Sequence, residues 1–137
     1  MGTVVLDASV LIALVDASDA HHGGAQAAIE DGRASGDLFV VPVSAYAEYM
    51  VRAFRDDPLG PTFRDSLMES IPALVEPATR AIGRTAAALR ARHGRRLPLP
   101  DALIVGTAIE LAADRIVTAD ARWPKLEVPV RLLEVST

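Results

Sequence analysis

The chain alternates short apolar runs with longer helical segments, and this alternation limits its fold more than any other feature. The stretches typical of strands are 2–6, 37–43, 115–118 and 128–135, with a short extended piece at 72–78. The stretches typical of helices are 10–15, 25–31, 44–54, 63–70, 79–92 and 101–113. Strands that alternate with helices form βαβ units, which bury a parallel sheet between helices. We therefore predict an α/β fold of three layers, with a central, mostly parallel sheet flanked by helices.

The length and composition fit one compact domain over residues 1–137. Half of the residues are hydrophobic and 23% are charged, so the chain can bury a core. It contains no cysteine, which excludes disulfides and thiolate metal ligands and is compatible with a reducing compartment. The N-terminus has no basic flank, and Asp7 interrupts its apolar run, so it resembles neither a signal peptide nor a membrane span. We expect a cytoplasmic protein without membrane contact.

A single acid lies inside the most apolar stretch of the chain, VVLDASVLIALVD at residues 4–16. Burying an unpaired carboxylate such as that of Asp7 costs several kcal/mol. Two explanations remain open. Either hydrogen-bond donors at the start of the next helix satisfy Asp7, or a cation that the sequence does not encode lies beside it. Ser9, two residues further on, is expected to cap that helix.

A second acid, Glu48, falls in the first turns of the helix expected after strand 37–43. Ser44 is the expected N-cap of this helix. The spacing predicts one apolar stripe on the helix, made of Tyr46, Met50 and Phe54. Glu48 lies at the edge of that stripe, near the end of the sheet, although taken alone it is better explained as a solvated surface residue.

Two further acids occupy comparable positions near strand ends. Asp101 follows Pro100 and opens a helix, where an acid can simply complement the helix dipole or cap its first turn. Asp120 follows the strand 115–118 by two residues, where turn chemistry alone would explain it. Thr118, the last residue of that strand, is equally explained as an ordinary strand former. In parallel α/β sheets, however, ligands bind at the carboxyl ends of the strands.

Together the four acids indicate a metal site. Two unit charges about 4 Å apart repel by roughly 4 kcal/mol at an effective dielectric constant of 20. Four clustered carboxylates therefore require protons or a cation. Ligation by oxygen alone suits Mg²⁺ or Mn²⁺ rather than zinc. The three histidines do not have the spacing of a helical zinc motif: His21, His22 and His93.

Positive charge is concentrated in one segment of an otherwise acidic chain. The formal net charge is −4, which does not indicate a general nucleic-acid-binding protein. The segment RTAAALRARHGRR, residues 84–96, nevertheless gathers five arginines. A solvated helix face explains these arginines. The alternative is contact with phosphate groups, for which Arg92, Arg95 and Arg96 lie closest in sequence to Asp101.

Three motifs make the chain resemble the PIN-domain ribonucleases, specifically the VapC toxins of toxin–antitoxin pairs. VVLDASVLIAL is similar to the opening strand of the family with its first acid and the serine two residues on. VPVSAYAE is similar to the segment with the second acid. RRLPLPDALIVGTAIELAADRIVTADARW is similar to the segment with the third acid, its helix, and the strand that ends in Thr-x-Asp. Residues 56–75 match nothing in the family residue by residue.

The resemblance implies a PIN-like fold and a metal-dependent endonuclease that cuts RNA to leave 5′-phosphate and 3′-hydroxyl ends. It implies that Asp7, Glu48 and Asp101 surround Mg²⁺ or Mn²⁺, with Asp120 as a fourth acid. Ser9 and Thr118 would be supporting hydroxyls that orient ligands or water. It further implies a homodimer and an antitoxin partner that covers the site.

Three other functions would also fit parts of the pattern. A catalytically idle PIN-like module would bind RNA or proteins without cleaving RNA, although the presence of all four acids argues against it. A receiver-type signalling domain also gathers acids at strand ends, but it needs a lysine after its last core strand, and the only lysine here follows Trp123 and Pro124 in a turn. A haloacid-dehalogenase-type phosphatase needs a second aspartate at the position of Ser9.

Overall fold

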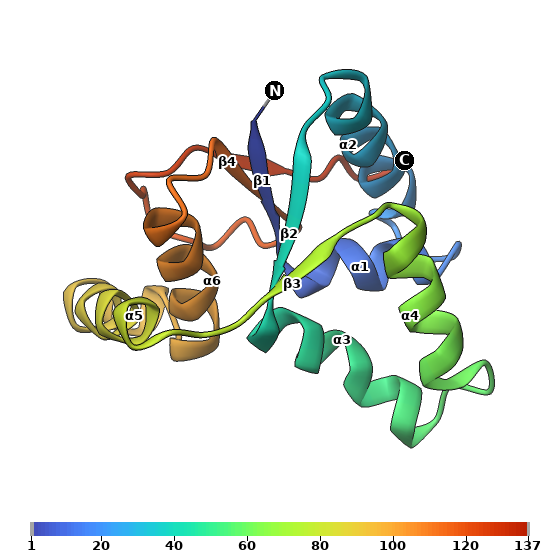
Figure 1. Ribbon diagram of the computed structural model, residues 1–137, viewed down its shortest axis with the longest axis horizontal. Helices are drawn as coiled ribbons and strands as arrows, with labels where there is room; N and C mark the ends of the chain where they lie inside the picture. Colours follow the sequence, from blue (N-terminus) through green and yellow to red (C-terminus); the bar gives the residue numbers. More distant parts are fainter. Residues whose placement is uncertain (1, 137) are drawn as a thin grey trace.

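The computed structural model describes residues 2–136 and contains a sheet of five parallel strands with helices around it (Figure 1). Its elements, in chain order, are β1 (Thr3–Leu6), α1 (Ala8–Val15), α2 (His22–Ala34), β2 (Leu38–Pro42), α3 (Val43–Arg55), α4 (Gly60–Ser70), β3 (Leu74–Glu76), α5 (Arg80–His93), the short 3₁₀ turn η1 (Gly94–Arg96), α6 (Leu99–Glu110), β4 (Arg115–Thr118) and β5 (Val130–Leu132). The predicted α/β class and the parallel sheet are confirmed.

The strand order is β3-β2-β1-β4-β5, with every neighbouring pair parallel. Helices α5 and α6 lie on one side of the sheet and α1, α2 and α4 on the other, which gives the three layers expected (Figure 1). Helix α3 continues directly from the carboxyl end of β2 and runs below that edge of the sheet (Figure 1). The order differs from the 2-1-3-4-5 order of receiver domains, so the receiver alternative is wrong.

The centre of the sheet is entirely apolar because both of its faces are covered. Val4, Val5 and Leu6 of β1 are fully buried. In β4, Ile116 is fully buried and Val117 is 1% exposed. A parallel strand buried on both faces reads as a continuous hydrophobic run, not as an alternating one. Within residues 2–136, no helix is long and apolar enough to cross a lipid bilayer.

Three helix starts differ from the sequence-based prediction. Asp7, not Ser9, is the N-cap of α1, because the Asp7 carboxylate accepts a hydrogen bond from the backbone N–H of Ala8. Pro42, not Ser44, precedes the first turn of α3, since β2 runs into this helix without a connecting loop. Helix α6 begins at Leu99 rather than at Asp101, because a proline is tolerated in the first turn, where its missing N–H has no partner to lose.

The buried face of α3 also differs from the predicted stripe. Met50 is buried as expected, but Phe54 is 75% exposed. The residues that face the core are instead Ala45, Tyr49, Met50 and Ala53. Near its C-terminal end the helix extends past the edge of the sheet, so hydrophobic spacing alone does not identify which face the neighbouring elements cover.

The segment 56–75, which resembled nothing, forms α4 and the approach to β3. It is joined to α3 by a buried arginine. The Arg64 guanidinium is stacked 5.0 Å from the centre of the Tyr49 ring and donates hydrogen bonds to the Tyr49 carbonyl (2.6 Å) and to the Asp57 carboxylate (3.0 Å). The Tyr49 hydroxyl in turn donates to the Arg64 carbonyl (2.8 Å). These contacts satisfy a charge that would otherwise be costly to bury.

Two glycines provide a matched test of this packing. A methyl group on Gly24, in the first turn of α2, would collide with the backbone of Glu134, whose nitrogen would lie 2.7 Å away. We expect Gly24→Ala to lower the free energy of unfolding by roughly 1–3 kcal/mol, because backbone cannot give way as a side chain can. Gly83 in α5 has open space around it. Gly83→Ala should therefore raise the free energy of unfolding by about 0.5–1 kcal/mol. Urea denaturation measures both, and a Gly24→Ala variant as stable as Gly83→Ala would contradict the packing.

Candidate functional site

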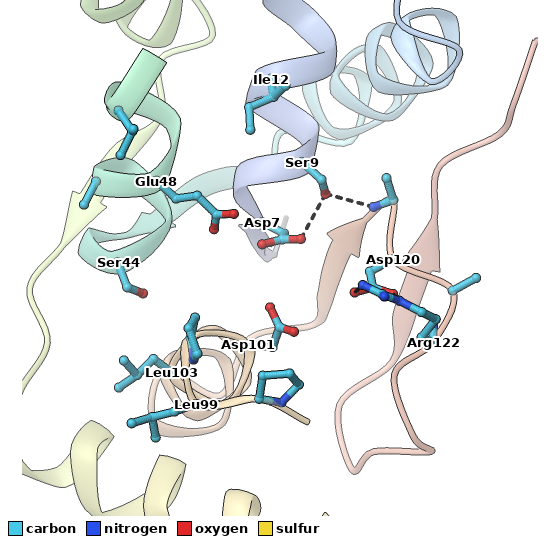
Figure 2. A pocket seen from close by; sticks show the side chains of 16 residues that line it. Asp7, Ser9, Ile12, Ser44, Glu48, Leu99, Asp101, Leu103, Asp120 and Arg122 are labelled. Carbon is cyan, nitrogen blue, oxygen red and sulfur yellow. Dashed lines mark hydrogen bonds and ion pairs between the residues drawn. The ribbon is translucent and has the colours of Figure 1, made fainter. Parts of the chain in front are cut away.

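The four acids singled out in the sequence line one open pocket at the carboxyl edge of the sheet, with a volume of about 1010 Å³. Each comes from a different element: Asp7 from the end of β1, Glu48 from α3, Asp101 from the first turn of α6 and Asp120 from the turn after β4. Figure 2 shows the carboxylates of Glu48 and Asp101 pointing toward that of Asp7. Residues up to 113 positions apart in the chain therefore share one cavity, as the strand-end argument predicts.

Asp7 is the most tightly held of the four acids, with only 7% of its surface exposed. One carboxylate oxygen, Oδ1, accepts from the backbone N–H of Ala8 at 2.8 Å. The other, Oδ2, accepts from the hydroxyls of Ser9 (2.9 Å) and Thr118 (2.7 Å). Three donors thus satisfy this carboxylate inside an apolar run, so the first of the two explanations left open by the sequence is confirmed. These bonds also fix its orientation.

The Ser9 and Thr118 hydroxyls join the ends of β1 and β4. The Ser9 hydroxyl accepts from the backbone N–H of Ala119 (3.0 Å), and that of Thr118 accepts from the backbone N–H of Asp120 (3.1 Å). Each hydroxyl therefore donates to Asp7 and accepts from the turn that holds Asp120. The two hydroxyls orient one acid directly and position the other through the backbone.

The environment of Asp101 opposes its negative charge. Burial in the pocket raises the pKa of Asp101 from its ordinary value of 3.8 to about 6, and repulsion from Asp7, Asp120 and, to a smaller extent, Glu48 acts in the same direction. The Trp123 indole N–H opposes part of this rise. That N–H is buried near the carboxylate, but its geometry falls short of a full hydrogen bond to Asp101 or to any other group of residues 2–136. Asp101 is therefore a carboxylate that lacks a compensating positive charge.

Glu48 experiences the same opposition more weakly. The residue as a whole is exposed, but its carboxylate faces into the pocket (Figure 2). The loss of solvent there, followed by repulsion from Asp7, raises the pKa of Glu48 above its ordinary range. Glu48 is thus a flexible acid at the mouth of the pocket, on the helix that forms one of its walls.

Within residues 2–136, Asp120 is the one acid of the four that has a cationic partner. Arg122 donates from Nε to Oδ1 and from Nη2 to Oδ2, each at 3.1 Å, and from its backbone N–H to Oδ1 at 2.9 Å. These bonds hold the pKa of Asp120 below its usual range. The sequence analysis did not identify Arg122. The available signal was an arginine two residues after an aspartate in a turn, a spacing at which the aspartate accepts from the backbone N–H.

The donor set fits a hard divalent cation in its chemistry. All four acids supply oxygen ligands, and two of them have pKa values raised by their surroundings, which is the electrostatic signature of a site that favours a positive ion. Among residues 2–136, however, no three acidic or histidine side chains form a ready-made coordination sphere. Coordination by this set would therefore require Glu48, Asp101 or Asp120 to rotate toward the fixed Asp7.

The structure separates the three arginines that were expected near the site. Arg95 and Arg96, in η1, line a smaller pocket of about 300 Å³ together with Asp101, Asp120 and Arg122. Arg92 lies one turn earlier on α5, lines neither of these pockets, and is 4.0 Å from Glu127 in an exposed ion pair. Arg95 and Arg96 therefore lie beside the acids, whereas Arg92 does not.

The raised pKa of Asp101 predicts how the stability of the metal-free protein depends on pH. Between about pH 4 and pH 6 the folded protein holds a proton on Asp101 that the unfolded chain has released, so the free energy of unfolding falls as the pH rises. Asp101→Asn removes this loss and should gain about 1–2 kcal/mol near pH 7, after allowance for solvent screening at a half-buried group. Urea denaturation in EDTA across this range measures the effect. A pH profile unchanged from that of the unmutated protein would contradict it.

The Thr118 hydroxyl gives a second prediction. Thr118→Val keeps the shape of this fully buried residue but removes one donor from Asp7 and the acceptor of the Asp120 N–H. We expect a loss of about 1–3 kcal/mol in the free energy of unfolding. Thr118→Ser keeps the hydroxyl and loses only a methyl group, which should cost about 1 kcal/mol. If Thr118→Ser were as destabilising as Thr118→Val in thermal denaturation, the hydroxyl would not be the stabilising group.

Comparison with solved structures places this fold among toxins of toxin–antitoxin pairs. The protein is similar to VapBC2 from Rickettsia felis bound to a DNA fragment from its promoter (TM-score 0.76, 14% identity, 96% of this chain and 99% of that chain covered). It is similar to a toxin–antitoxin complex from Klebsiella pneumoniae (TM-score 0.66, 23% identity, 85% and 86% covered). It is also similar to Mycobacterium tuberculosis VapC20, a Sarcin-Ricin loop cleaving toxin (TM-score 0.65, 20% identity, 82% and 86% covered).

At these identities the solved structures establish the fold alone. A search of curated proteins found no match to the sequence. The family assignment rests instead on a direct match of the sequence to the PIN domain over residues 4–129, a range that contains all four acids and every strand except β5 and the first residue of β1. The chain belongs to the PIN-domain family.

Proposed function

We propose that this protein is a metal-dependent endoribonuclease and the toxin component of a type II toxin–antitoxin system. The observation that carries the proposal is the convergence of Asp7, Glu48, Asp101 and Asp120 from four separate elements on one pocket. A structural role does not require four acids to gather where two of them have raised pKa values. A site that holds a divalent cation does require several carboxylates to gather in this way.

In the proposed mechanism the role of each carboxylate depends on how firmly it is held. Asp7, fixed by three hydrogen bonds, sets the position of the ligand sphere, and Asp101 and Asp120 would complete it. When bound, Mg²⁺ or Mn²⁺ would lower the pKa of a water molecule and neutralise charge on the phosphate oxygens. Glu48, at the open mouth of the pocket, would accept a proton from the attacking water and orient it for in-line attack on the phosphodiester.

The surroundings of the acids support a polyanionic substrate. A pocket of four carboxylates alone would repel RNA, whereas Arg95 and Arg96 border two of these acids, Asp101 and Asp120, from η1. Their guanidinium groups would bind phosphates next to the one that is cut. Such contacts do not distinguish one base sequence from another. The M. tuberculosis toxin named above cleaves the Sarcin-Ricin loop, and for the present chain we propose RNA as the substrate without assigning the target.

An antitoxin partner and a homodimer belong to the same proposal. Part of the lining of the pocket is apolar: it includes the exposed side chains of Val51 (52%) and Leu99 (51%), together with Ile12 and Leu103. An exposed apolar lining beside an acidic centre suits a protein segment that combines apolar side chains with a positive charge. One of the similar structures, from Klebsiella pneumoniae, is a toxin–antitoxin complex. We propose the cytoplasm as the compartment.

The test is cleavage of total RNA by the purified protein. We expect cutting with Mg²⁺ or Mn²⁺ and none in excess EDTA. Asp101→Asn and Asp7→Asn should each lower the rate by about 100-fold or more, because each removes a negatively charged ligand. Asp56→Asn, a matched change of an exposed acid outside the pocket, should leave the rate unchanged. Circular dichroism confirms that each variant is folded, which matters most for Asp7 because it also caps α1.

Cleavage that persists in EDTA would contradict the mechanism. RNA binding without cleavage under any divalent ion would favour the idle PIN-like module instead. Mapping of cut transcripts after brief expression, with Asp101→Asn as the control, identifies the target.

A further inference from the structure

The ion pair between Asp120 and Arg122 has no role in the mechanism proposed above and conflicts with part of it. Arg122 engages both oxygens of Asp120 in a two-pronged arrangement. As long as this ion pair is formed, both carboxylate oxygens of Asp120 are occupied by Arg122, a cation that belongs to the chain itself. Asp120 can join a metal-ligand sphere fully only when the guanidinium withdraws, because a guanidinium and a divalent cation compete for the same oxygens and repel each other.

Withdrawal of Arg122 would disturb nothing else. Its side chain is 89% exposed, and all of its hydrogen bonds within the described chain go to Asp120. An exposed ion pair of this kind contributes little to stability. By contrast, the buried pair of Arg64 with Asp57 is 6% and 13% exposed and connects α4 to the loop that precedes it. Arg122 is therefore free to exchange partners, whereas Arg64 is not.

The place to which Arg122 can turn is the smaller pocket, which it lines together with Arg95 and Arg96. Within residues 2–136 neither Arg95 nor Arg96 has an ion-pair partner. Three arginines thus already border one cavity next to Asp101 and Asp120, and release of Asp120 would free the third guanidinium to face it. Such a cluster matches the oxygens of a phosphate group.

We propose that Arg122 exchanges partners: it neutralises Asp120 in the metal-free protein, and on metal binding it turns to hold, with Arg95 and Arg96, a phosphate of the RNA strand next to the one that is cut. This inference rests on the proposed function. It adds that the site contains its own substitute cation, which limits the repulsion among the acids before the metal arrives. It also adds that RNA contact and metal binding are coupled through one side chain.

The exchange makes opposite predictions for two binding constants of Arg122→Ala. Without a competing guanidinium, Mn²⁺ should bind the RNA-free protein about 2- to 10-fold more tightly, as measured by calorimetry. RNA should bind this variant more weakly in Ca²⁺, with a gel to check that the RNA stays intact. A plot of the logarithm of the RNA-binding constant against the logarithm of the salt concentration should have a slope that is shallower by about 0.7–0.9. Arg122→Lys keeps the charge but loses the two-pronged geometry, so it should retain most of the salt slope.

The matched control is Arg55→Ala, which removes an exposed arginine from an ion pair with Asp56 outside both pockets. It should change neither constant. An Arg122→Ala variant that binds Mn²⁺ equally well or more weakly, or that binds RNA with the salt slope of the unmutated protein, would overturn the exchange. A general loss of structure would weaken both constants together, and is therefore distinguished from the predicted opposite changes.

Two further arms separate the possible causes of failure. Inorganic phosphate that displaces RNA far below the ionic strength at which chloride does so would indicate a site for free phosphate, and would overturn the assignment to the strand. If the unmutated protein neither binds nor cuts RNA with any divalent ion, the proposed function fails, whereas the Mn²⁺ measurement on RNA-free protein still reports on the competition itself. If the protein cuts RNA and Arg122→Ala changes nothing, only the exchange fails.

Discussion

The rest of the site depends on how the carboxylate of Asp7 is held at the end of β1. It lies in the most apolar stretch of the chain, where an unsatisfied charge would be costly, and three donors from Ala8, Ser9 and Thr118 satisfy it. The same bonds start helix α1 and connect β1 to β4. A single group therefore caps a helix, joins two strands and presents a fixed negative charge to the pocket, so the local fold and the proposed chemistry cannot be altered independently.

Around this fixed charge the other acids show a graded response to repulsion. Asp101 has a pKa raised to about 6 by burial and by its neighbours, Glu48 has a smaller rise, and Asp120 escapes it by pairing with Arg122. The metal-free site is thus a compromise in which protons and one arginine offset part of the charge. A divalent cation would replace both, which is why we connect the metal proposal with the movement of Arg122.

The sequence predicted the strands and the four acids because each depends on local pattern and on one rule, that parallel strands end at the same edge. It left open whether Asp7 or Ser9 caps α1, and it did not predict the third donor to Asp7, because the Thr118 hydroxyl comes from a residue 111 positions away. Arg122 was missed because its importance comes from the partner it faces. The exposure of Phe54 and the packing of α4 against α3 could not be predicted from the sequence either. Both depend on where α3 extends past the edge of the sheet.

The most direct measurement of the central claim is the anomalous scattering of a crystal grown with Mn²⁺. The account predicts one strong peak within ligand distance of the Asp7 carboxylate, with oxygens of Asp101 and of at least one of Glu48 and Asp120 turned toward it. It also predicts that the Arg122 guanidinium no longer pairs with Asp120 wherever Asp120 is a ligand. A pocket without a peak at saturating Mn²⁺, or with the ion bound away from Asp7, would contradict it.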